Sequence, residues 1–278
     1  MSLVQNRSQL KITTWNINSV RKRIESIKIF IKDFAPDILL LQETKVNNEL
    51  FPYQIFQEIG YAFTHYDGEK TGYNGVAILA KQELEIIPKI SFIKEARHLA
   101  AKTNCGIEIH NFYIPAGGDI PDPKINQKFE YKLDLLDQLK LWFEQEKKAS
   151  SKIILTGDLN IAPLENDVWS HKRLLKIVSH TPIEVDKLAS LYNSINFKDA
   201  VRKFTPDSEK LYSWWSYRAK DWQKANKGRR LDHIWVTESL YQDIIHAEIS
   251  QYTRGLDTPS DHVPVSIILS IKNSEQNN

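Results

Sequence analysis

Polar side chains lie at the ends of several apolar runs in this 278-residue chain. Asn16 and Glu43 lie at or just after the ends of the first two runs, and Tyr113 lies near the end of a later one. Asp158 and Asn160 follow a further run in the sequence Gly-Asp-Leu-Asn. If these runs are strands, their ends and the following loops meet at one edge of a sheet, where α/β proteins commonly bind ligands.

Polar residues in the last part of the chain lie at the beginnings of apolar runs rather than at their ends. Asp232 begins an apolar run, and Asp261 and His262 immediately precede the final one. If all these groups share one site, the last two strands must run opposite to the earlier ones. This pattern predicts mixed or antiparallel sheets rather than one fully parallel, doubly wound sheet.

The chemistry available in this set is that of oxygen ligands and one imidazole. Cys105 is the single cysteine, so neither an internal disulfide nor a cysteine cluster for zinc is possible. Carboxylate and amide oxygens suit Mg²⁺ or Mn²⁺, and Mg²⁺ sites are often completed by substrate phosphate. An Asp–His pair can stabilise charge on a phosphate oxygen. Each residue alone could equally be a turn or strand-end residue, so the argument depends on the whole set.

The elements that must position these residues can be located from apolar runs bounded by turn residues. The expected strands are Ile12–Ile17, Ile38–Leu41, Gly75–Ala80, Cys105–Ile114, Ile153–Ile161, Tyr212–Tyr217, Leu231–Thr237, Ala247–Tyr252 and Val263–Ile271. Long loops are expected over Pro115–Asn126 and Arg218–Arg230.

Helical spacing of apolar residues appears between these strands. One helix contains Ile24, Ile27, Ile31 and Phe34 and should stop before Pro36. A longer one should run from about Phe129 to Phe143. A third should begin at Thr181-Pro182-Ile183-Glu184, which has the residues of a capping box.

We expect one domain over residues 11–271, with a flexible N-terminus over 1–10 and a disordered tail over 272–278. The composition is 41% hydrophobic and 26% charged, which excludes a wholly disordered chain. No apolar run approaches the ~20 residues that cross a bilayer, and the first residues lack the apolar centre of a secretory signal. The single cysteine and these absences favour the cytoplasm.

Eight segments resemble the exonuclease III family of abasic-site endonucleases, of bacterial type, within the DNase I-like metal-dependent phosphoesterases. They occur in the family's order and span about residues 11 to 271. They are Thr14-Trp15-Asn16-Ile17-Asn18, Leu41-Gln42-Glu43-Thr44-Lys45, Gly72-Tyr73-Asn74-Gly75-Val76-Ala77, Asn111-Phe112-Tyr113-Ile114-Pro115, Gly157-Asp158-Leu159-Asn160-Ile161, Ser213-Trp214-Trp215-Ser216-Tyr217, Arg230-Leu231-Asp232 and Ser260-Asp261-His262.

The resemblance implies a four-layered α/β sandwich in which two mixed β-sheets pack face to face between outer helices. It also implies Mg²⁺-dependent hydrolysis of the phosphodiester 5′ to an abasic site, with Mn²⁺ as a substitute and a 3′-hydroxyl as product. The implied partner is double-stranded DNA with abasic sites or blocked 3′ ends, including 3′-to-5′ exonuclease and 3′-end-cleaning activity. A monomer near the nucleoid in the cytoplasm, without a membrane, is expected.

The same resemblance assigns roles by position. The residues implied in metal binding are Asn16, Glu43, Asp158, Asn160, Asp261 and His262. Asp158 would deprotonate water, Asn160 and Tyr113 would contact the phosphate, and His262, held by Asp232, would stabilise it. The catalytic set is therefore Tyr113, Asp158, Asn160, Asp232 and His262.

DNA contacts are implied for a second set of residues: Arg21, Tyr73, Trp214, Tyr217, Arg229, Arg230 and Leu231. Trp214 and Leu231 match positions that line the pocket for an extruded abasic sugar. The segment Arg218–Arg230 has six basic residues and one acid, a local charge of +5. It suits a phosphate-contacting edge, although such a run can also be an ordinary solvated loop.

Two features depart from the best-known relatives: Arg229 at a pocket position that is often apolar, and the segment Leu164–His180. Either could shift the balance between internal cleavage and 3′-end trimming.

Three other readings remain open. The scaffold could instead carry a phosphoinositide or sphingolipid phosphodiesterase. It could also be a nucleic-acid-binding module without catalysis, or, more remotely, Cys105 could be a nucleophile.

Overall fold

The apolar runs form two six-stranded sheets in the computed structural model, which describes residues 7–272. The first sheet has the spatial order β13 (Ile244–Ile249), β14 (Val265–Lys272), β1 (Arg7–Asn16), β2 (Ile38–Gln42), β4 (Val76–Ala80) and β3 (Phe63–Asp67). The second has the order β5 (Glu85–Ile87), β6 (His98–Lys102), β7 (Glu108–Tyr113), β8 (Ile153–Asp158), β12 (Asp232–Val236) and β9 (Lys198–Asp199).

Both sheets are mixed, as the strand-end pattern predicted. β1 pairs in parallel with β2, and β7 pairs in parallel with β8. The late strands run the other way, since β14 is antiparallel to β1 and β12 is antiparallel to β8. The ends of early strands therefore meet the beginnings of late strands at one edge.

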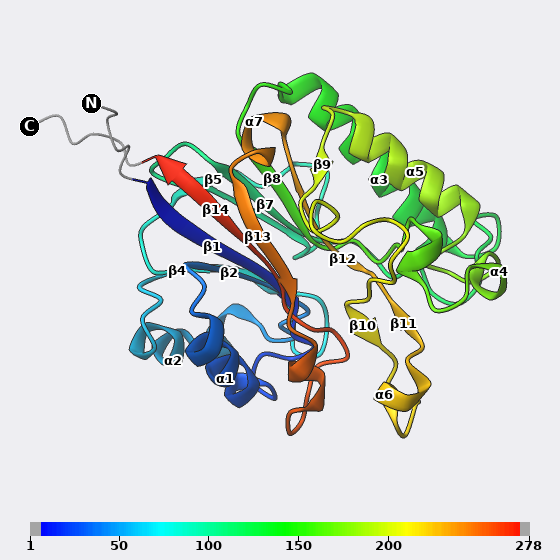
Figure 1. Ribbon diagram of the computed structural model, residues 1–278, viewed down its shortest axis with the longest axis horizontal. Helices are drawn as coiled ribbons and strands as arrows, with labels where there is room; N and C mark the ends of the chain where they lie inside the picture. Colours follow the sequence, from blue (N-terminus) through cyan, green and yellow to red (C-terminus); the bar gives the residue numbers. More distant parts are fainter. Residues whose placement is uncertain (1–6, 273–278) are drawn as a thin grey trace, which may run out of the picture.

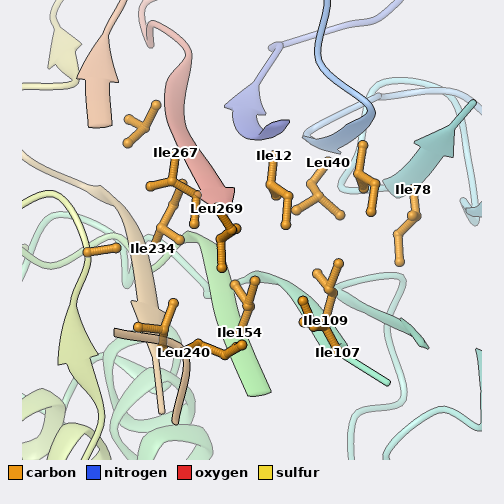
Figure 2. Close-up of a cluster of buried hydrophobic side chains, with 14 of the residues drawn as sticks. Ile12, Leu40, Ile78, Ile107, Ile109, Ile154, Ile234, Leu240, Ile267 and Leu269 are labelled. Atoms are coloured by element: carbon orange, nitrogen blue, oxygen red, sulfur yellow. The ribbon is translucent and has the colours of Figure 1, made fainter. Parts of the chain in front are cut away.

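The two sheets pack face to face through aliphatic side chains. Ile12 and Leu40 point inward from the first sheet, and Ile154 and Ile234 point inward from the second (Figure 2). In β2, alternate residues such as Leu39 face the opposite way and pack with Phe30. Because strands alternate their side chains between faces, a continuous apolar run such as β2 is buried on both sides.

Helices cover the outer faces and complete four layers (Figure 1). α1 (Ile24–Phe34) and α2 (Tyr53–Glu58) lie on the first sheet, and α3 (Gln127–Glu146) and α5 (Pro182–Asn193) lie on the second. The expected capping box of α5, between Thr181 and Glu184, is present. The expected four-layered α/β sandwich is thereby confirmed.

Short elements complete the chain. A two-stranded arm contains β10 (Trp214–Trp215) and β11 (Gly228–Arg229). The short helices are α4 (His171–Leu174), α6 (Trp222–Ala225), α7 (Glu238–Tyr241), η1 (Asn48–Leu50), η2 (Glu165–Asp167) and η3 (Gln251–Gly255). No helix within residues 7–272 is long and apolar enough to cross a membrane.

Several expected boundaries were wrong. The edge strands β3 and β5 were not anticipated, because partly exposed edge strands lack continuous apolar runs. Arg218–Arg230 is not one loop, since it contains α6 and β11. Cys105 precedes β7 rather than lying within it.

The folded region extends beyond the expected N-terminal boundary. β1 begins at Arg7 because residues 7–10 pair with β14, so this part of the expected flexible N-terminus is strand. At the other end, β14 includes Lys272. The remaining terminal expectations, over 1–6 and 273–278, lie outside the described residues.

Candidate active site where the two sheets meet

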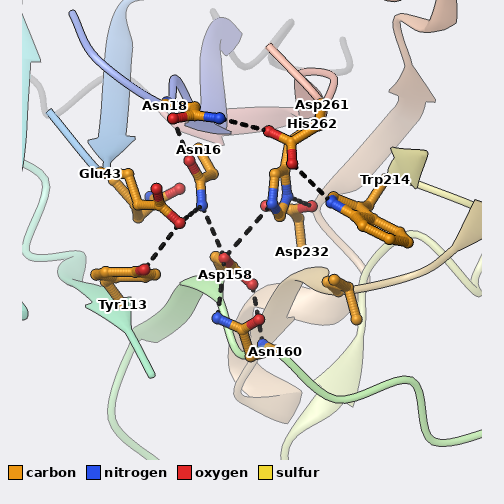
Figure 3. Close-up of polar contacts among 12 residues, drawn as sticks. Asn16, Asn18, Glu43, Tyr113, Asp158, Asn160, Trp214, Asp232, Asp261 and His262 are labelled. Carbon is orange, nitrogen blue, oxygen red and sulfur yellow. Dashed lines mark hydrogen bonds and ion pairs between the residues drawn. The ribbon is translucent and has the colours of Figure 1, made fainter. Parts of the chain in front are cut away.

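One edge of the sandwich gathers the polar residues that the sequence placed at strand ends (Figure 3). The first sheet contributes Asn16 from the end of β1, and Glu43 directly after β2. The second contributes Tyr113 and Asp158, the last residues of β7 and β8. The strand beginnings and loops at this edge add Asn160, Asp232, Asp261 and His262.

The Asn16 amide joins the two sheets. Its Nδ2 donates hydrogen bonds to Glu43 Oε1 at 3.0 Å and to Asp158 Oδ2 at 2.8 Å. The Tyr113 hydroxyl donates to the same Glu43 oxygen at 2.8 Å. Asn16 and Asp158 are fully buried, whereas the Glu43 side chain is 18% exposed. Glu43 therefore presents a carboxylate whose Oε1 is fixed by two neutral donors and which is still reachable from solvent.

An uncommon backbone conformation orients the side chains of Glu43 and Asn160. Glu43 and Asn160 have positive φ angles of 49° and 54°, which are uncommon for residues with side chains and occur at functional sites. Gly157 is required beside Asp158, because a Cβ there would lie 1.9 Å from the Phe112 carbonyl oxygen. This close approach of β8 to β7 explains the glycine in the Gly-Asp-Leu-Asn segment.

Asp158 is tied to the residue two positions later. The Asn160 backbone N–H donates to Asp158 Oδ1 at 2.9 Å, and Asn160 Nδ2 donates to Oδ2 at 3.1 Å. Asn160 Nδ2 also donates to the Ile114 carbonyl at 2.8 Å. These contacts fix both carboxylate oxygens of Asp158.

His262 forms a buried pair with Asp232. Its Nδ1 lies 2.8 Å from Asp232 Oδ2, which also accepts a hydrogen bond of 2.6 Å from Ser213. Its Nε2 faces Asp158 Oδ2 at 3.7 Å. Burial lowers the pKa of His262, but the charges of Asp232 and Asp158 outweigh it and raise the pKa to about 10. The imidazole is therefore protonated at neutral pH.

The pKa values of the two carboxylates that accept hydrogen bonds from Asn16 are shifted in opposite directions. Burial, aided by repulsion from Asp232 and Glu43, raises the pKa of Asp158 to about 7 against the attraction of His262. Burial also acts to raise the pKa of Glu43, but Lys45 at 2.7 Å and the Asn16 amide lower it overall. Glu43 is thus a permanent anion, whereas Asp158 is poised to exchange a proton near neutral pH.

The donor set is suited to a metal ion. Asp158, Asp232 and His262 each place one ligand atom within 4.8 Å of the others in a buried cluster. A protonated imidazole has no free lone pair, so the cluster could bind a metal only with His262 neutral. Glu43 and Asp261 supply further carboxylates, and oxygen-rich sets fit hard cations. The chemistry of the residues therefore fits the divalent metal expected from the sequence.

Asp261 and Trp214 form the rim beside His262. Asp261 Oδ2 accepts a hydrogen bond of 3.0 Å from the indole of Trp214, and its Oδ1 accepts one of 2.9 Å from Asn18. Trp214 is half-buried and packs with Leu231, which is 5% exposed. The adjacent Trp215 is a core residue.

The other expected DNA contacts are dispersed. Arg21, Tyr73 and Tyr217 are exposed, and the Tyr217 hydroxyl accepts a hydrogen bond from Arg23. Arg229 is half-buried on β11.

Arg230 does not fit the expected role. It is completely buried, and Asp167 and Asp199 hold its guanidinium in ion pairs. The expectation of a DNA contact at Arg230 is corrected to a structural role, because its side chain does not reach the surface.

The sequence did not single out several residues that support the site. Lys45 forms an ion pair with Glu43, and Ser213 donates to Asp232. Both lie inside segments that carried the resemblance, and Lys45 lies only two residues from Glu43, so these segments were a usable signal. Arg97 places its guanidinium 4.8 Å from the centre of the Tyr113 ring, although no motif marked it.

The sequence of this chain matches known proteins over nearly its whole length. The pattern described as the Endonuclease/Exonuclease/phosphatase family matches residues 13–262. Exodeoxyribonuclease III of Haemophilus influenzae is 33% identical over 270 residues, covering 92% of this chain and 98% of the relative.

Two solved structures also share the fold over nearly their whole length. An AP endonuclease from Archaeoglobus fulgidus has a TM-score of 0.87 and 32% identity, over 94% of this chain and 100% of that one. A 3′ phosphatase from Neisseria, solved with a product DNA hairpin, has a TM-score of 0.83 and 29% identity, over 93% and 98%. The chain therefore belongs to the Endonuclease/Exonuclease/phosphatase family, among homologues that are exodeoxyribonucleases III and AP endonucleases.

Proposed function

We propose that the protein is a Mg²⁺-dependent DNA-repair nuclease that hydrolyses the phosphodiester 5′ to abasic sites in duplex DNA and leaves a 3′-hydroxyl. Exonuclease action from 3′ ends and removal of 3′-blocking groups would use the same chemistry. The observation that carries the proposal is the placement of Asp158 between the Asn16 amide and the protonated His262. A proton acceptor and a cationic donor thereby share one small site.

The protein's own residues divide the reaction between them. Asp158 would accept a proton from the attacking water, for which a pKa of about 7 is suitable. His262, held by Asp232, would donate from Nε2 to a phosphate oxygen and stabilise its negative charge. Tyr113 and Asn160 would fix the phosphate from the other side, since both already point into this space (Figure 3).

Glu43 and Asn16 would hold Mg²⁺, with Asp261 nearby and Mn²⁺ as a possible substitute. Asn16 would have to use its Oδ1, which now accepts a hydrogen bond from the Asn18 N–H at 3.1 Å. Such an ion supplies Lewis-acid stabilisation of negative charge on the phosphate. The low pKa of Glu43 keeps this carboxylate charged and ready for the ion.

A DNA-binding surface would surround this site. Trp214 and Leu231 would receive the extruded abasic sugar, and Arg21, Tyr73 and Tyr217 would contact the backbone. The arm formed by β10, α6 and β11 projects from the sandwich (Figure 1) and exposes four cations: Arg218, Lys220, Lys224 and Lys227. Exposed cations on a projecting arm suit contacts with phosphate groups.

The direct test is incubation with a duplex that carries one tetrahydrofuran abasic analogue, first with Mg²⁺ and then with EDTA. We expect one cut on the 5′ side in Mg²⁺ and none in EDTA. Binding without cleavage in Mg²⁺ or Mn²⁺ would contradict the repair assignment, and cutting in EDTA would contradict the metal requirement. Parallel incubation with inositol phosphates should give no turnover, which separates this activity from that of lipid phosphoesterases.

A further inference from the structure

Arg229 lies beside the candidate active site through two steps of backbone pairing. Trp214 forms an isolated bridge with His262, and Arg229 pairs with Trp214 between β10 and β11. Two strand spacings correspond to about 10 Å. The Arg229 guanidinium lies 5.3 Å from the centre of the Trp214 ring. This cation therefore lies over Trp214, two strand spacings from His262.

The guanidinium is held in place but its charge is not neutralised. Its Nη1 donates to the Val178 carbonyl at 3.0 Å and to Ser179 Oγ at 2.6 Å. Its Nε is buried without a hydrogen-bond partner within residues 7–272. In that region Arg229 also has no carboxylate within 4.0 Å, whereas its neighbour Arg230 has two. The buried Glu184 carboxylate attracts Arg229 from beyond 4.0 Å, but it forms its ion pair with Lys132. A half-buried cation without an ion pair of its own is costly and favours the arrival of an anion.

A second pair of cations continues the same surface. Val168 bridges to Arg229 on the side away from Trp214, and the next residue, Trp169, has two cations over its ring. The Arg173 guanidinium lies 5.5 Å and the Lys227 ammonium 5.1 Å from the ring centre. Neither cation forms an ion pair within the described part of the chain. These two exposed cations add positive charge to the surface that continues from Arg229.

We propose that Arg229 is a specificity-determining residue that binds an anionic group, a carboxylate or a phosphate, on the 3′ side of the scissile phosphate. The inference rests on the proposed function, which places the scissile phosphate at His262. Because Nη1 is already engaged and Nε is buried, Nη2 is the group left to donate a charge-assisted hydrogen bond to a carboxylate or phosphate oxygen. A neutral sugar fragment cannot use that charge.

This arrangement selects among 3′-blocking fragments by charge. Water attacks phosphorus, the bond to the 3′ oxygen breaks, and the 3′-hydroxyl takes a proton while the phosphate leaves with its fragment. A 3′-phosphoglycolate end has a carboxylate on that fragment. The same end esterified with ethylene glycol has a neutral hydroxyl instead. The two substrates differ chiefly in the group that Arg229 would bind.

The test compares kcat/KM on three duplexes: the 3′-phosphoglycolate end, the matched ethylene glycol end, and an internal tetrahydrofuran site. Arg229→Gln should lower kcat/KM on phosphoglycolate about 10- to 100-fold while the ethylene glycol end changes less than about threefold. Arg229→Lys should recover part of the loss, because it restores charge without the planar fork. If Arg229→Gln also slows the tetrahydrofuran duplex, the bound anion includes the phosphate of the next nucleotide.

Lys102→Gln is a charge-matched control at the far end of β6, opposite Glu108 rather than Tyr113. This variant should leave kcat/KM on all three duplexes within about twofold of the wild-type values. An equal change of both 3′-end substrates in Arg229→Gln would overturn the inference, because damage to the fold lowers both. Failure of the proposed function is distinguishable, since wild-type protein would then cut none of the three duplexes in Mg²⁺.

Discussion

Nε2 of His262 lies 3.7 Å from Oδ2 of Asp158, farther than a hydrogen bond requires, while its Nδ1 is held at 2.8 Å by Asp232. The imidazolium is thus fixed from behind, and its second N–H is free to donate to an incoming oxygen atom. The same Asp158 oxygen is oriented by Asn16 from the other sheet. A phosphate or water entering between these groups would find both a proton donor and a proton acceptor.

Replacing Asp158 by Asn should lower the cleavage rate by roughly 10²–10⁴, because the amide cannot accept a proton from water. The amide occupies nearly the same volume, so binding of abasic duplex DNA should persist. Single-turnover rates and a binding titration measure the two effects separately. Near-wild-type turnover would refute the assignment of Asp158 as the base.

Replacing Asp232 by Asn should lower kcat by about 10²-fold and change KM little, because His262 loses the charge that keeps it protonated. The Ser213→Ala variant keeps the Asp232 carboxylate and should have a smaller effect on kcat. It removes the 2.6 Å hydrogen bond to that carboxylate and the two that Ser213 Oγ accepts from the backbone N–H groups of Leu231 and Asp232. Steady-state kinetics on the tetrahydrofuran duplex measures both variants. A change confined to KM would mean that Asp232 acts in binding rather than through His262.

Replacing Glu43 by Gln should raise the Mg²⁺ concentration for half-maximal activity by roughly 10- to 100-fold, because a permanent carboxylate is lost from the proposed metal site. Titration of activity with Mg²⁺ measures this shift. Glu49→Gln provides a control, since this exposed acid lies in η1 and away from β2. An unchanged Mg²⁺ titration would place the ion elsewhere, with the buried cluster of Asp158, Asp232 and His262 as the next site to test.

The ion pair between Lys132 and Glu184 should be important for stability. Both side chains are completely buried, and Lys132 also donates to the Asn160 carbonyl at 2.9 Å. Lys132→Met leaves the Glu184 carboxylate without its cation, which should lower the free energy of unfolding by about 3–5 kcal/mol. Urea unfolding measures the change. A loss below about 1 kcal/mol would contradict this role.

Acid should destabilise the protein through His233. Burial and the charge of Arg230 lower the pKa of this histidine to about 4. The unfolded chain takes up a proton near pH 6.5, whereas the folded chain does not until about pH 4, so stability is lost as the pH falls between these values. Between pH 7.5 and pH 5 the loss should be about 2 kcal/mol. Urea unfolding at both pH values should show a smaller difference in His233→Asn.

The site could be predicted from sequence because it lies where strands begin and end. Asn16, Glu43 and Asp158 follow apolar runs, while Asp232 begins one, and a shared site then required antiparallel late strands. β12 and β14 have this direction. The continuous apolar run of β2 and the capping box of α5 are equally local signals, so they did not need knowledge of distant residues.

The features that were missed depend on contacts between distant parts of the chain. Arg230 was expected at the DNA surface from its place in a basic run, but Asp167 and Asp199 hold it inside the protein. Arg97 reaches Tyr113 only because β6 and β7 are neighbours. A charge count along the sequence does not reveal which cations are neutralised by acids elsewhere, and this distinction separates Arg230 from Arg229.

The candidate site is divided between the two sheets, so the aliphatic layer that separates the sheets also separates its polar groups. Asn16 and Glu43 move with one sheet, and Tyr113 and Asp158 move with the other, so the thickness of the layer around Ile12 and Ile154 sets the gap between them. Adding or removing methyl groups in this layer would therefore change the spacing of the polar groups while leaving every side chain of the candidate site unchanged.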